Sequence, residues 1–274
     1  MNSPKITIIT VVYNGVKELE KTIKSVINQS YKNIEYIIID GGSNDGTVDL
    51  IKNYNSKIAY WISEVDLGIY DAMNKGIKQA NGDWIYFLNC GDCLINNETI
   101  NIIFQNYKQD EADIIYGDIV YVYSFGHYKA KPLPLSQFKN QFPIFHPACF
   151  IKACVLKKNL FNLKYRIAAD FELLRRLYYS KFIFKYTPEI VSLFDSESGI
   201  SSTRHLQLYS EVLDITEKSK TFSGYLQIIK LYIKIKVGLV IKIFLSNKRL
   251  NMIRKKNLEK DIRYSRFNYT NDIV

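Results

Sequence analysis

Runs of apolar, β-branched residues alternate with segments of helical periodicity between residues 6 and 88, and this alternation constrains the fold more than any other feature of the sequence. The first run, Ile-Thr-Ile-Ile-Thr-Val-Val at 6–12, carries no charge, which is typical of a strand buried on both faces. Strands that alternate with helices along a chain form parallel sheets with helices on both faces. The sequence therefore predicts an α/β fold with a mostly parallel central sheet. The expected strands lie at 6–12, 34–39, 58–63 and 84–88, and the expected helices at 17–30, 47–54 and 69–80.

Polar residues follow three of these runs directly. They are Tyr13 and Asn14 after the first run, residues 40–46 after the second and residues 89–92 after the fourth. Each cluster alone has the composition of an ordinary turn. Because the carboxyl ends of parallel strands share one edge of a sheet, where ligands bind in open α/β folds, the three clusters together indicate a binding site.

The residues at this edge favour a nucleoside diphosphate as the ligand. The dinucleotide fingerprint G-x-G-x-x-G does not follow the first strand, and the sequence has no phosphate loop of the form G-x-x-x-x-G-K-[ST]. Asp40 can accept hydrogen bonds from a base or ribose, and the two glycines after it let the backbone approach a ligand closely. Asp92 can hold a hard divalent cation, Mg²⁺ or Mn²⁺, which bridges diphosphate oxygens.

Four stretches in order along the chain carry a family resemblance. They are Ile-Ile-Thr-Val-Val-Tyr-Asn at 8–14, Ile-Asp-Gly-Gly-Ser-Asn-Asp-Gly-Thr at 39–47, Glu-Val-Asp-Leu-Gly-Ile-Tyr-Asp-Ala-Met-Asn-Lys-Gly at 64–76 and Tyr-Phe-Leu-Asn-Cys-Gly-Asp at 86–92. Together they resemble family 2 glycosyltransferases of the GT-A fold, and most of all the single-domain bacterial enzymes that build surface polysaccharides. The resemblance extends over residues 5–205. Processive members carry a Q-x-x-R-W motif that this sequence lacks, so transfer of one sugar per encounter is expected.

The resemblance implies a donor site at the carboxyl edge of the sheet. It places Asp40 against uracil or an equivalent base, and Asp92 at the end of the metal-binding DxD motif. The sequence departs from the pattern here, because Asn89-Cys-Gly-Asp92 keeps only the last acidic residue. For Tyr70 the alternative is packing in the core. The residues implied to bind the nucleotide or the donor sugar are Thr10, Val12, Asn14, Asp40, Gly42, Asp66, Tyr70, Asp71, Asn89 and Gly91.

Two further segments, 145–150 and 165–172, resemble the acceptor side of the family, and the second implies Asp170 as the general base. The chemistry agrees, because a sugar hydroxyl is a poor nucleophile until a carboxylate within hydrogen-bond reach takes its proton. A base on one side of the sugar and a cation on the leaving diphosphate at the other predict a single displacement with inversion.

His146, Arg204 and His205 are expected to contact the acceptor or a phosphate. For His146 the alternative is a satisfied polar group packed before Pro147. Arg204 and His205 follow a Ser-Gly-rich loop that could close on the donor. Glu172 lies two residues from Asp170 and so on another helix face, where a solvated charge is expected.

The net charge of +10 is concentrated near the C-terminus. Residues 1–217 carry 23 Lys and Arg against 24 Asp and Glu, whereas residues 218–266 carry 14 basic residues against two acidic ones. We therefore expect a catalytic domain at 1–215, with a nucleotide-sugar half at 1–120 and an acceptor half at 121–215. Basic amphipathic helices are expected at 216–274.

The stretch 224–245 is apolar but contains four lysines, so it is not expected to cross a bilayer. Its spacing predicts a basic amphipathic helix of the kind that lies in a membrane interface. Packing on its own domain, or on a second copy in a homodimer, is the alternative. On a helical wheel, the basic residues Lys230, Lys234, Lys242, Lys248 and Arg249 fall within about a third of the circle. The opposite, apolar face holds Leu226, Ile229, Ile233, Val237, Val240 and Phe244.

The predicted function is transfer of one sugar from a nucleoside diphosphate donor, expected to be a UDP-sugar, to a lipid-linked saccharide in bacterial surface polysaccharide synthesis. The N-terminus has no export signal, so the protein is expected in the cytoplasm, peripheral on the inner face of the plasma membrane and bound to its anionic surface through 218–266. Four cysteines fit a reducing compartment, and a zinc site formed by all four is the alternative to free thiols.

Two other classes of function are weighed against this prediction. A sugar nucleotidyltransferase shares the α/β scaffold, but normally carries a Gly-rich basic loop after the first strand, unlike residues 11–15. A non-enzymatic basic module for a membrane or nucleic acid would use the C-terminal charge. It leaves the carboxylates of the expected site without a role, and no nucleic-acid partner is expected. Those carboxylates are Asp40, Asp66, Asp71, Asp92 and Asp170.

Overall fold

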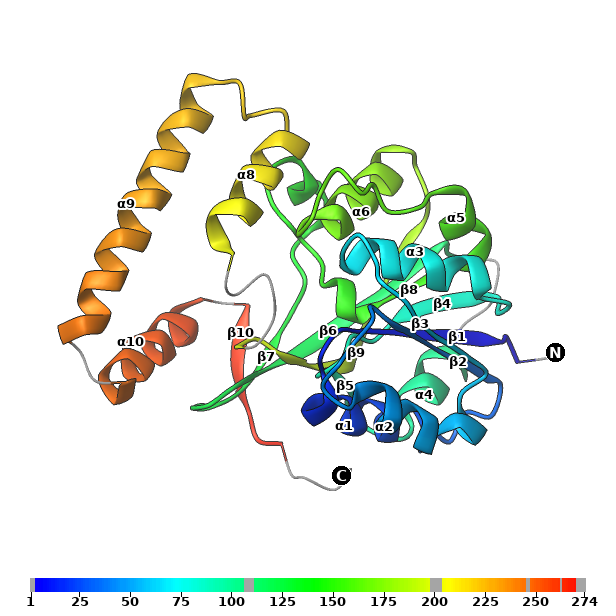
Figure 1. Cartoon of the computed structure of the whole chain (residues 1–274). Coiled ribbons are helices and arrows are strands. Elements are labelled where there is room, and N and C mark those ends of the chain that lie inside the picture. The colour runs from blue at the N-terminus through cyan, green and yellow to red at the C-terminus, as the bar shows by residue number, and fades with distance from the viewer. Residues whose placement is uncertain (1–2, 106–110, 198–203, 245–246, 262, 270–274) are drawn as a thin grey trace.

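Four parallel strands form the first half of the sheet, as the apolar runs predict (Figure 1). Their order in space is β3-β2-β1-β4, so the chain starts in the middle and crosses over through helices in both directions. The strands are β1 (Ile6–Val12), β2 (Ile34–Asp40), β3 (Tyr60–Ser63) and β4 (Trp84–Phe87). The helices that follow β1, β2 and β3 are α1 (Val16–Ile27), α2 (Thr47–Asn53) and α3 (Ile69–Gln79).

The second half of the sheet is mainly antiparallel, so the sheet as a whole is mixed. The computed structural model describes residues 3–105, 111–197, 204–244, 247–261 and 263–269. Beyond β4 the sheet continues in the order β8-β6-β7-β10, and the long β9 pairs with β5 and runs parallel to β6. These strands are β5 (Cys93–Leu94), β6 (Ile114–Tyr123), β7 (Gly126–Ala130), β8 (Cys149–Lys152), β9 (Phe184–Asp195) and β10 (Tyr264–Phe267).

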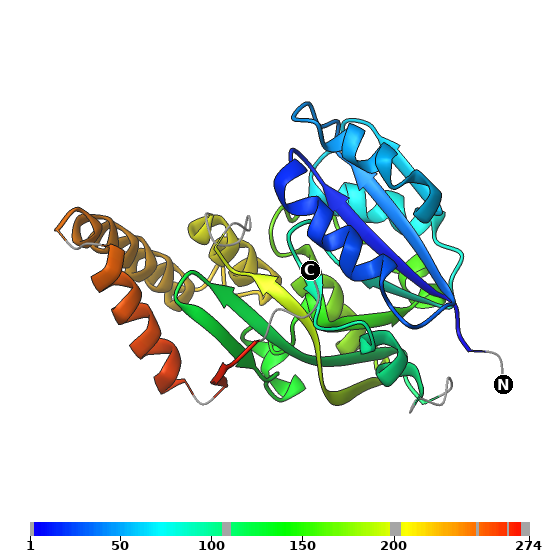
Figure 2. The same cartoon turned by 90° about the horizontal axis from the view of Figure 1, so that it is seen from below.

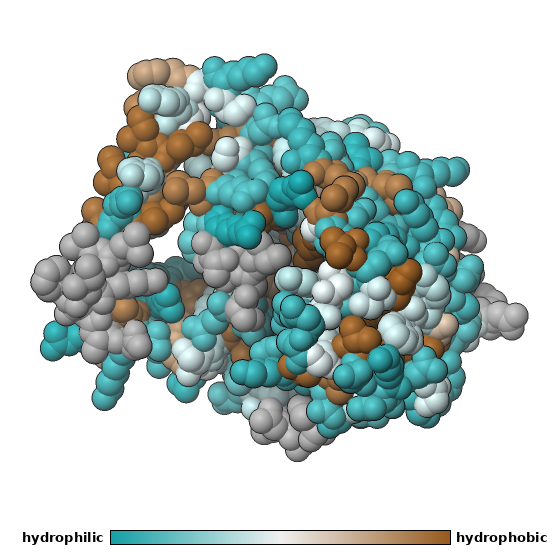
Figure 3. Space-filling model, in the orientation of Figure 1, coloured by the Kyte–Doolittle hydropathy of each residue, from teal (hydrophilic) through white to brown (hydrophobic). Residues whose placement is uncertain are grey.

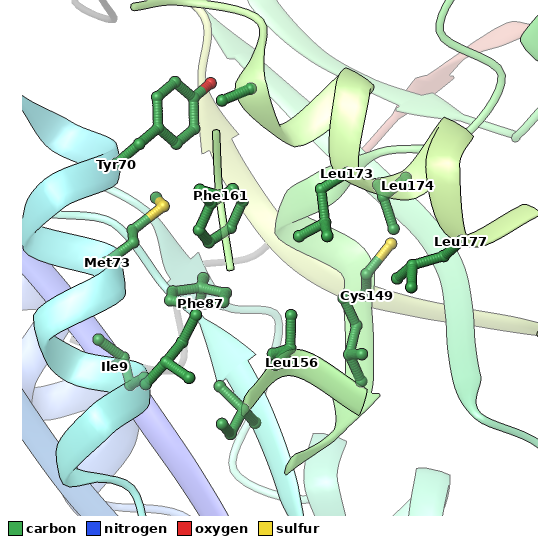
Figure 4. Packing of buried hydrophobic residues seen from close by; sticks show 14 of the residues in the cluster. Ile9, Tyr70, Met73, Phe87, Cys149, Leu156, Phe161, Leu173, Leu174 and Leu177 are labelled. Atoms are coloured by element: carbon green, nitrogen blue, oxygen red, sulfur yellow. The ribbon is translucent and has the colours of Figure 1, made fainter. Parts of the chain in front are cut away.

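Helices cover both faces of the parallel strands, which explains why most residues of these strands are apolar. Ile9 and Ile37 face a core formed with α3, α5 (Ala153–Lys158) and α6 (Ala169–Tyr179) (Figure 4). Ile8 and Ile38 point the other way, into a core formed with α1, α2 and α4 (Thr99–Gln105). Successive residues of a strand alternate between faces, so each strand contributes to both cores.

The C-terminal segment leaves the sheet and then returns to it (Figure 2). α8 (His205–Ile215) leads into α9 (Phe222–Phe244), which is followed by α10 (Asn247–Lys260). β10 then pairs antiparallel with β7, with Tyr264 opposite Ala130 and Phe267 opposite His127. The segment predicted as helices alone, 216–274, therefore also contributes a strand to the catalytic sheet.

α9 exposes an apolar stripe. Its described members recur at helical spacing, and brown side chains gather over α9 in Figure 3. The side opposite this stripe contains buried Gly224 and the half-buried Ile228 and Leu231. Within the described residues no helix combines the length and apolarity that a membrane span requires. The exposed stripe consists of Phe222, Leu226, Ile229, Ile233 and Val237, with Tyr225 and Tyr232 along one side.

Candidate active site

The loop after β2 is organised around the carboxylate of Asp40. Asp40 is fully buried and accepts hydrogen bonds from the backbone N–H groups of Gly42 (3.1 Å) and Ser43 (2.9 Å). The hydroxyls of Ser43 and Ser63 also donate to it. Gly42 has φ = +83°, a left-handed backbone that favours glycine. In this structure Asp40 shapes the loop, and the expectation that it reads a nucleobase stays a prediction.

The end of β1 is fastened to this loop by Asn14. Asn14 has φ = +49°, its N–H donates to the Ser43 hydroxyl (2.7 Å), and its side-chain oxygen accepts from the N–H of Asn44 (3.0 Å). Thr10 and Val12 are buried, and the Thr10 hydroxyl donates to the carbonyl of Leu88 (2.8 Å). The side chain of Thr10 therefore joins β1 to the end of β4 and offers no exposed surface to a nucleotide.

The segment before α3 carries the third group of predicted donor residues. Asp66 accepts from the N–H of Gly68 (2.7 Å), and Asp71 accepts from the N–H of Leu67 (3.0 Å). Asp66 also lies against Gly41, where a Cβ would come within 2.6 Å of its carboxylate oxygen. Contacts therefore link the loop after β2 to the segment before α3, as the sequence predicts for one donor site.

The predicted base, Asp170, lies at the N-terminal end of α6 and is held by Tyr70. The phenol oxygen of Tyr70 lies 2.9 Å from Asp170 Oδ1 and 2.7 Å from the carbonyl oxygen of Ile167, so its proton is shared between two acceptors. Asp170 is only partly buried, and burial raises its pKa to about 6. A carboxyl group with that pKa is ionised at neutral pH and is a stronger base than an ordinary aspartate.

Tyr70 is thus neither a plain core residue nor an exposed donor contact. Its ring packs against Phe161 with centroids 5.2 Å apart, and Figure 4 shows it at one end of the packed core, near Met73 and Phe161. Burial, followed by the charge of Asp170, raises the pKa of Tyr70 well above its ordinary value, so the phenol stays protonated and donates to Asp170.

Two side chains that sequence reasoning missed tie the donor loop to the base. The guanidinium of Arg166 donates to the carbonyl of Leu67, between Asp66 and Gly68. Glu211, on α8, accepts from the N–H groups of the residues just before α6. Glu211 belongs to no motif, and Arg166 lies within the acceptor-side segment 165–172, where only Asp170 stood out. Both act through contacts between segments far apart in the sequence. No local pattern signals either one.

The turn after β4 presents Asn89 and Asp92. Gly91 has φ = +98°, and its N–H bonds to the hydroxyl of Thr22 (3.0 Å), which fixes the turn. Asp92 is almost fully buried and accepts from the N–H of Asp195 (3.1 Å). Burial raises the pKa of Asp92 to about 8. The side-chain oxygen of Asn89 is buried without a hydrogen-bond partner.

These groups fit a hard divalent cation, because Asn89 supplies an orphaned oxygen and Asp92 a carboxylate, and Mg²⁺ prefers oxygen ligands. Among the described residues there is no group of three or more His, Cys, Asp or Glu side chains that could hold a metal. A cation here would therefore depend on oxygens from the diphosphate as well. The same finding removes the four-cysteine zinc site. Cys149 is buried, Cys90 and Cys93 are half-buried, and Cys154 is exposed.

His146 lies in an aromatic cluster beneath the site. Its ring stacks on Phe87 at 5.3 Å and meets Phe161 edge-on at 5.8 Å. Burial lowers its pKa to about 4, so the ring is neutral, and its Nε2 has no hydrogen-bond partner. Contact with a phosphate would therefore be a hydrogen bond without positive charge. The expectation that His146 contacts acceptor or phosphate stays a prediction.

Three further residues considered in the sequence analysis lie on or beside α6 and α8. Arg204 and His205 are exposed at the start of α8. The loop expected to close on the donor, 198–202, lies outside the described residues. Glu172 is not a solvated charge, because it is largely buried and its carboxylate lies 2.9 Å from Nε of Arg176.

Comparison with known proteins places the chain in a family. The model of glycosyl transferase family 2 matches residues 7–161. A PGL/p-HBAD biosynthesis glycosyltransferase of Mycobacterium bovis (strain BCG / Pasteur 1173P2) is 28% identical over 210 residues, covering 74% of this chain and 81% of the relative.

An uncharacterized glycosyltransferase of Mycobacterium tuberculosis (strain CDC 1551 / Oshkosh) is 45% identical over 92 residues, which are 33% of this chain and only 35% of that relative. Among solved structures, residues 1–349 of S. aureus TarS match with a TM-score of 0.61 at 19% identity, covering 77% of this chain and 64% of that one. The mannosyltransferase PcManGT from Pyrobaculum calidifontis, in complex with GDP-Man and Mn²⁺, matches with a TM-score of 0.60 at 11% identity, covering 93% and 80%.

The α/β fold with its curled sheet is that of GT-A-like glycosyltransferases. The chain belongs to glycosyl transferase family 2. This assignment confirms the resemblance carried by the four sequence motifs and disfavours the nucleotidyltransferase alternative.

Proposed function

We propose that the protein transfers one sugar from a nucleoside diphosphate sugar, with UDP as the nucleotide, to a saccharide acceptor, with inversion and with Asp170 as the base. The observation that carries this proposal is the position of Asp170, a partly exposed carboxylate with a raised pKa that Tyr70 holds beside the segment before α3. TarS has been solved with UDP and with UDP-GlcNAc, which supports a uridine donor.

The proposed reaction is a single displacement. Asp170 accepts the proton of an acceptor hydroxyl while that oxygen forms a bond to the anomeric carbon of the donor, and the bond from that carbon to the diphosphate oxygen breaks. A divalent cation held by Asn89 and Asp92 would offset the negative charge that develops on the departing diphosphate. Because attack and departure occur on opposite sides of the carbon, the configuration inverts. Transfer of either a hexosyl or an N-acetylhexosaminyl group from the donor fits the same chemistry.

A thermal-shift screen of nucleotide sugars, with and without Mn²⁺, tests the donor. A ligand at 100 times its Kd stabilises the folded state by about 2.7 kcal/mol, which raises the Tm of a chain this size by roughly 5–10 °C. We expect UDP-sugars to give such a shift in the presence of Mn²⁺, with NAD⁺ as the negative control. A screen in which no nucleotide sugar shifts the Tm would contradict the proposal.

We further propose that the acceptor is lipid-linked and that α9 docks on an anionic membrane surface. The apolar stripe of α9 is exposed, and the exposed Lys230 and Lys236 lie beside it, so one surface offers both apolar and cationic groups. Lys and Arg near an anionic leaflet contribute about 1 kcal/mol each.

Substitution within the stripe tests this docking better than truncation, because deleting 218–274 would also remove β10 from the sheet. The double variant Ile229→Glu with Ile233→Glu is expected to weaken binding to phosphatidylglycerol vesicles by at least tenfold in a cosedimentation assay, since burying one such side chain is worth about 1.5–3 kcal/mol. Ile183→Glu, at an exposed apolar position just before β9, is the control and should bind like the wild type. Unchanged vesicle binding, with loss of a dimer on size exclusion instead, would assign the stripe to a second copy.

A further inference from the structure

Glu211 of α8 gathers three consecutive backbone N–H groups. Its Oε1 accepts from Arg166 N (3.1 Å), and its Oε2 accepts from Ile167 N (2.9 Å) and Ala168 N (2.9 Å). Ala168 is the N-cap residue of α6, and its own side chain makes no capping hydrogen bond. Hydrogen bonds to an ionised carboxylate are about twice as strong as neutral ones, so Glu211 fixes the path of the chain into α6.

The same short segment is held from the other side by Tyr70. Ile167 donates its N–H to Glu211, and its carbonyl accepts from the Tyr70 hydroxyl, which also contacts Asp170. The peptide groups on both sides of Ile167 are therefore anchored, and the base follows three residues later. A shift of this segment would move the carboxylate of Asp170 away from its hydroxyl partner.

α8 is itself fixed to the catalytic domain near Glu211. Asp214, one helical turn further on, lies 2.6 Å from Nζ of Lys164 and 3.0 Å from the phenol oxygen of Tyr165. Gln207, one turn earlier, donates to Glu211 Oε1 (3.0 Å). Two acidic residues on one face of α8 thus hold residues 164–168, and the helix cannot shift without breaking both sets of contacts.

We propose that Glu211 is a positioning residue for the general base, acting through the backbone of 166–168 to hold Asp170 in its productive place. This inference rests on the proposed function, because it requires Asp170 to be the base. It makes α8, which no motif includes, a part of the catalytic apparatus.

If Glu211 positions Asp170, its charge should also affect the pKa of Asp170, which can be measured separately from the rate. The titratable groups that face Asp170 are Tyr70 on α3, Cys149 on β8 and Glu211 on α8. Burial is the largest cause of the raised pKa of Asp170, and the negative charge of Glu211 adds to it. Removing that charge therefore lowers the pKa of Asp170, so the base stays ionised to lower pH.

Glu211→Gln tests the inference in the full-length protein. Misplacing a catalytic group by about 1 Å can cost about 100-fold in rate, so we expect kcat to fall about 10- to 100-fold while the donor KM stays within about twofold. The acid limb of the kcat profile should move to lower pH. Glu211→Asp keeps the charge, but its shorter side chain moves the carboxylate oxygens away from the backbone N–H groups. It should therefore keep the wild-type position of the acid limb and give a kcat between those of the wild type and Glu211→Gln. Glu217→Gln makes the same chemical change at an exposed position just beyond α8. It should leave both kcat and the position of the acid limb unchanged.

Three results would overturn the inference: a wild-type kcat in Glu211→Gln, an acid limb that does not move, or a loss of Tm and nucleotide binding in proportion to the loss of activity. If Glu211→Gln does not fold, Glu211→Asp is the only test, and a wild-type kcat in Glu211→Asp would also overturn the inference. An inactive Asp170→Asn beside a normal Glu211→Gln rejects only this inference. An active Asp170→Asn rejects the proposed function itself.

Discussion

Replacing Asp170 by asparagine is expected to lower kcat by about 10²–10⁴-fold, the range over which general bases contribute. Asparagine keeps the size of the side chain and can still accept from the Tyr70 hydroxyl, but it cannot take the proton of the acceptor. Binding of UDP and of the UDP-sugar should stay within about twofold of the wild type, because Asp170 reacts with the acceptor. Calorimetric titration with UDP, beside initial rates of transfer, measures both quantities.

Glu172→Gln is the matched control for this experiment. Glu172 lies in the same turn of α6 but pairs with Arg176, so its substitution should change kcat by no more than a few-fold. The wild-type kcat should also fall as the pH drops below about 6, because protonation removes the base. A variant Asp170→Asn that retains normal turnover would show that another group accepts the proton.

Replacing Asp92 by alanine is expected to remove most metal-dependent activity, with a fall in kcat of about 10²–10³-fold. A cation at the leaving diphosphate is worth several kcal/mol of transition-state stabilisation, and each 1.36 kcal/mol is about tenfold in rate. The variant should also lose the Mn²⁺-dependent part of UDP affinity, because Asp92 supplies the only carboxylate of the Asn89-Cys-Gly-Asp92 turn. Titration with UDP in Mn²⁺ and in EDTA separates the two effects.

Asp49→Ala, on the exposed surface of α2, controls for the loss of one carboxylate and should behave like the wild type.

Asn89→Asp restores the first acidic residue of the family pattern, and it should bind Mn²⁺ more tightly than the wild type because it turns a neutral oxygen ligand into a charged one. Equal responses to Mn²⁺ in Asp92→Ala and the wild type would remove Asp92 from the cation site.

The sequence predicts the parallel half of the fold well because its strands are buried on both faces. β1 is buried along its whole length and β2 along all but its first residue, and polar residues mark where each strand ends. The antiparallel half gives no such signal. β9 has charged and aromatic residues mixed along twelve positions, and its pairing with β6 is interrupted by a register shift near Asp118, so no simple period describes it.

The motifs also predict which segments meet at the site, but not what each side chain contacts. Tyr70 and Asp170 are 100 residues apart in the sequence, and the structure joins them through one hydrogen bond. Asp40 is a conspicuous carboxylate in the sequence, yet its oxygens are occupied by its own loop. No sequence pattern predicts a role for Glu211, because its contacts arise only where α8 packs beside the start of α6.

The return of the chain to the sheet has a consequence for geometry. The pair α9 and α10 is attached to the catalytic domain at both ends, through α8 on one side and through β10 on the other (Figure 1). A helix attached at one end can rotate relative to its domain, whereas a pair of helices attached at both ends keeps a fixed angle to the domain. If α9 lies on a bilayer, the active site would stand at a fixed height and tilt above it, and the length of the acceptor glycan would decide which sugar reaches Asp170.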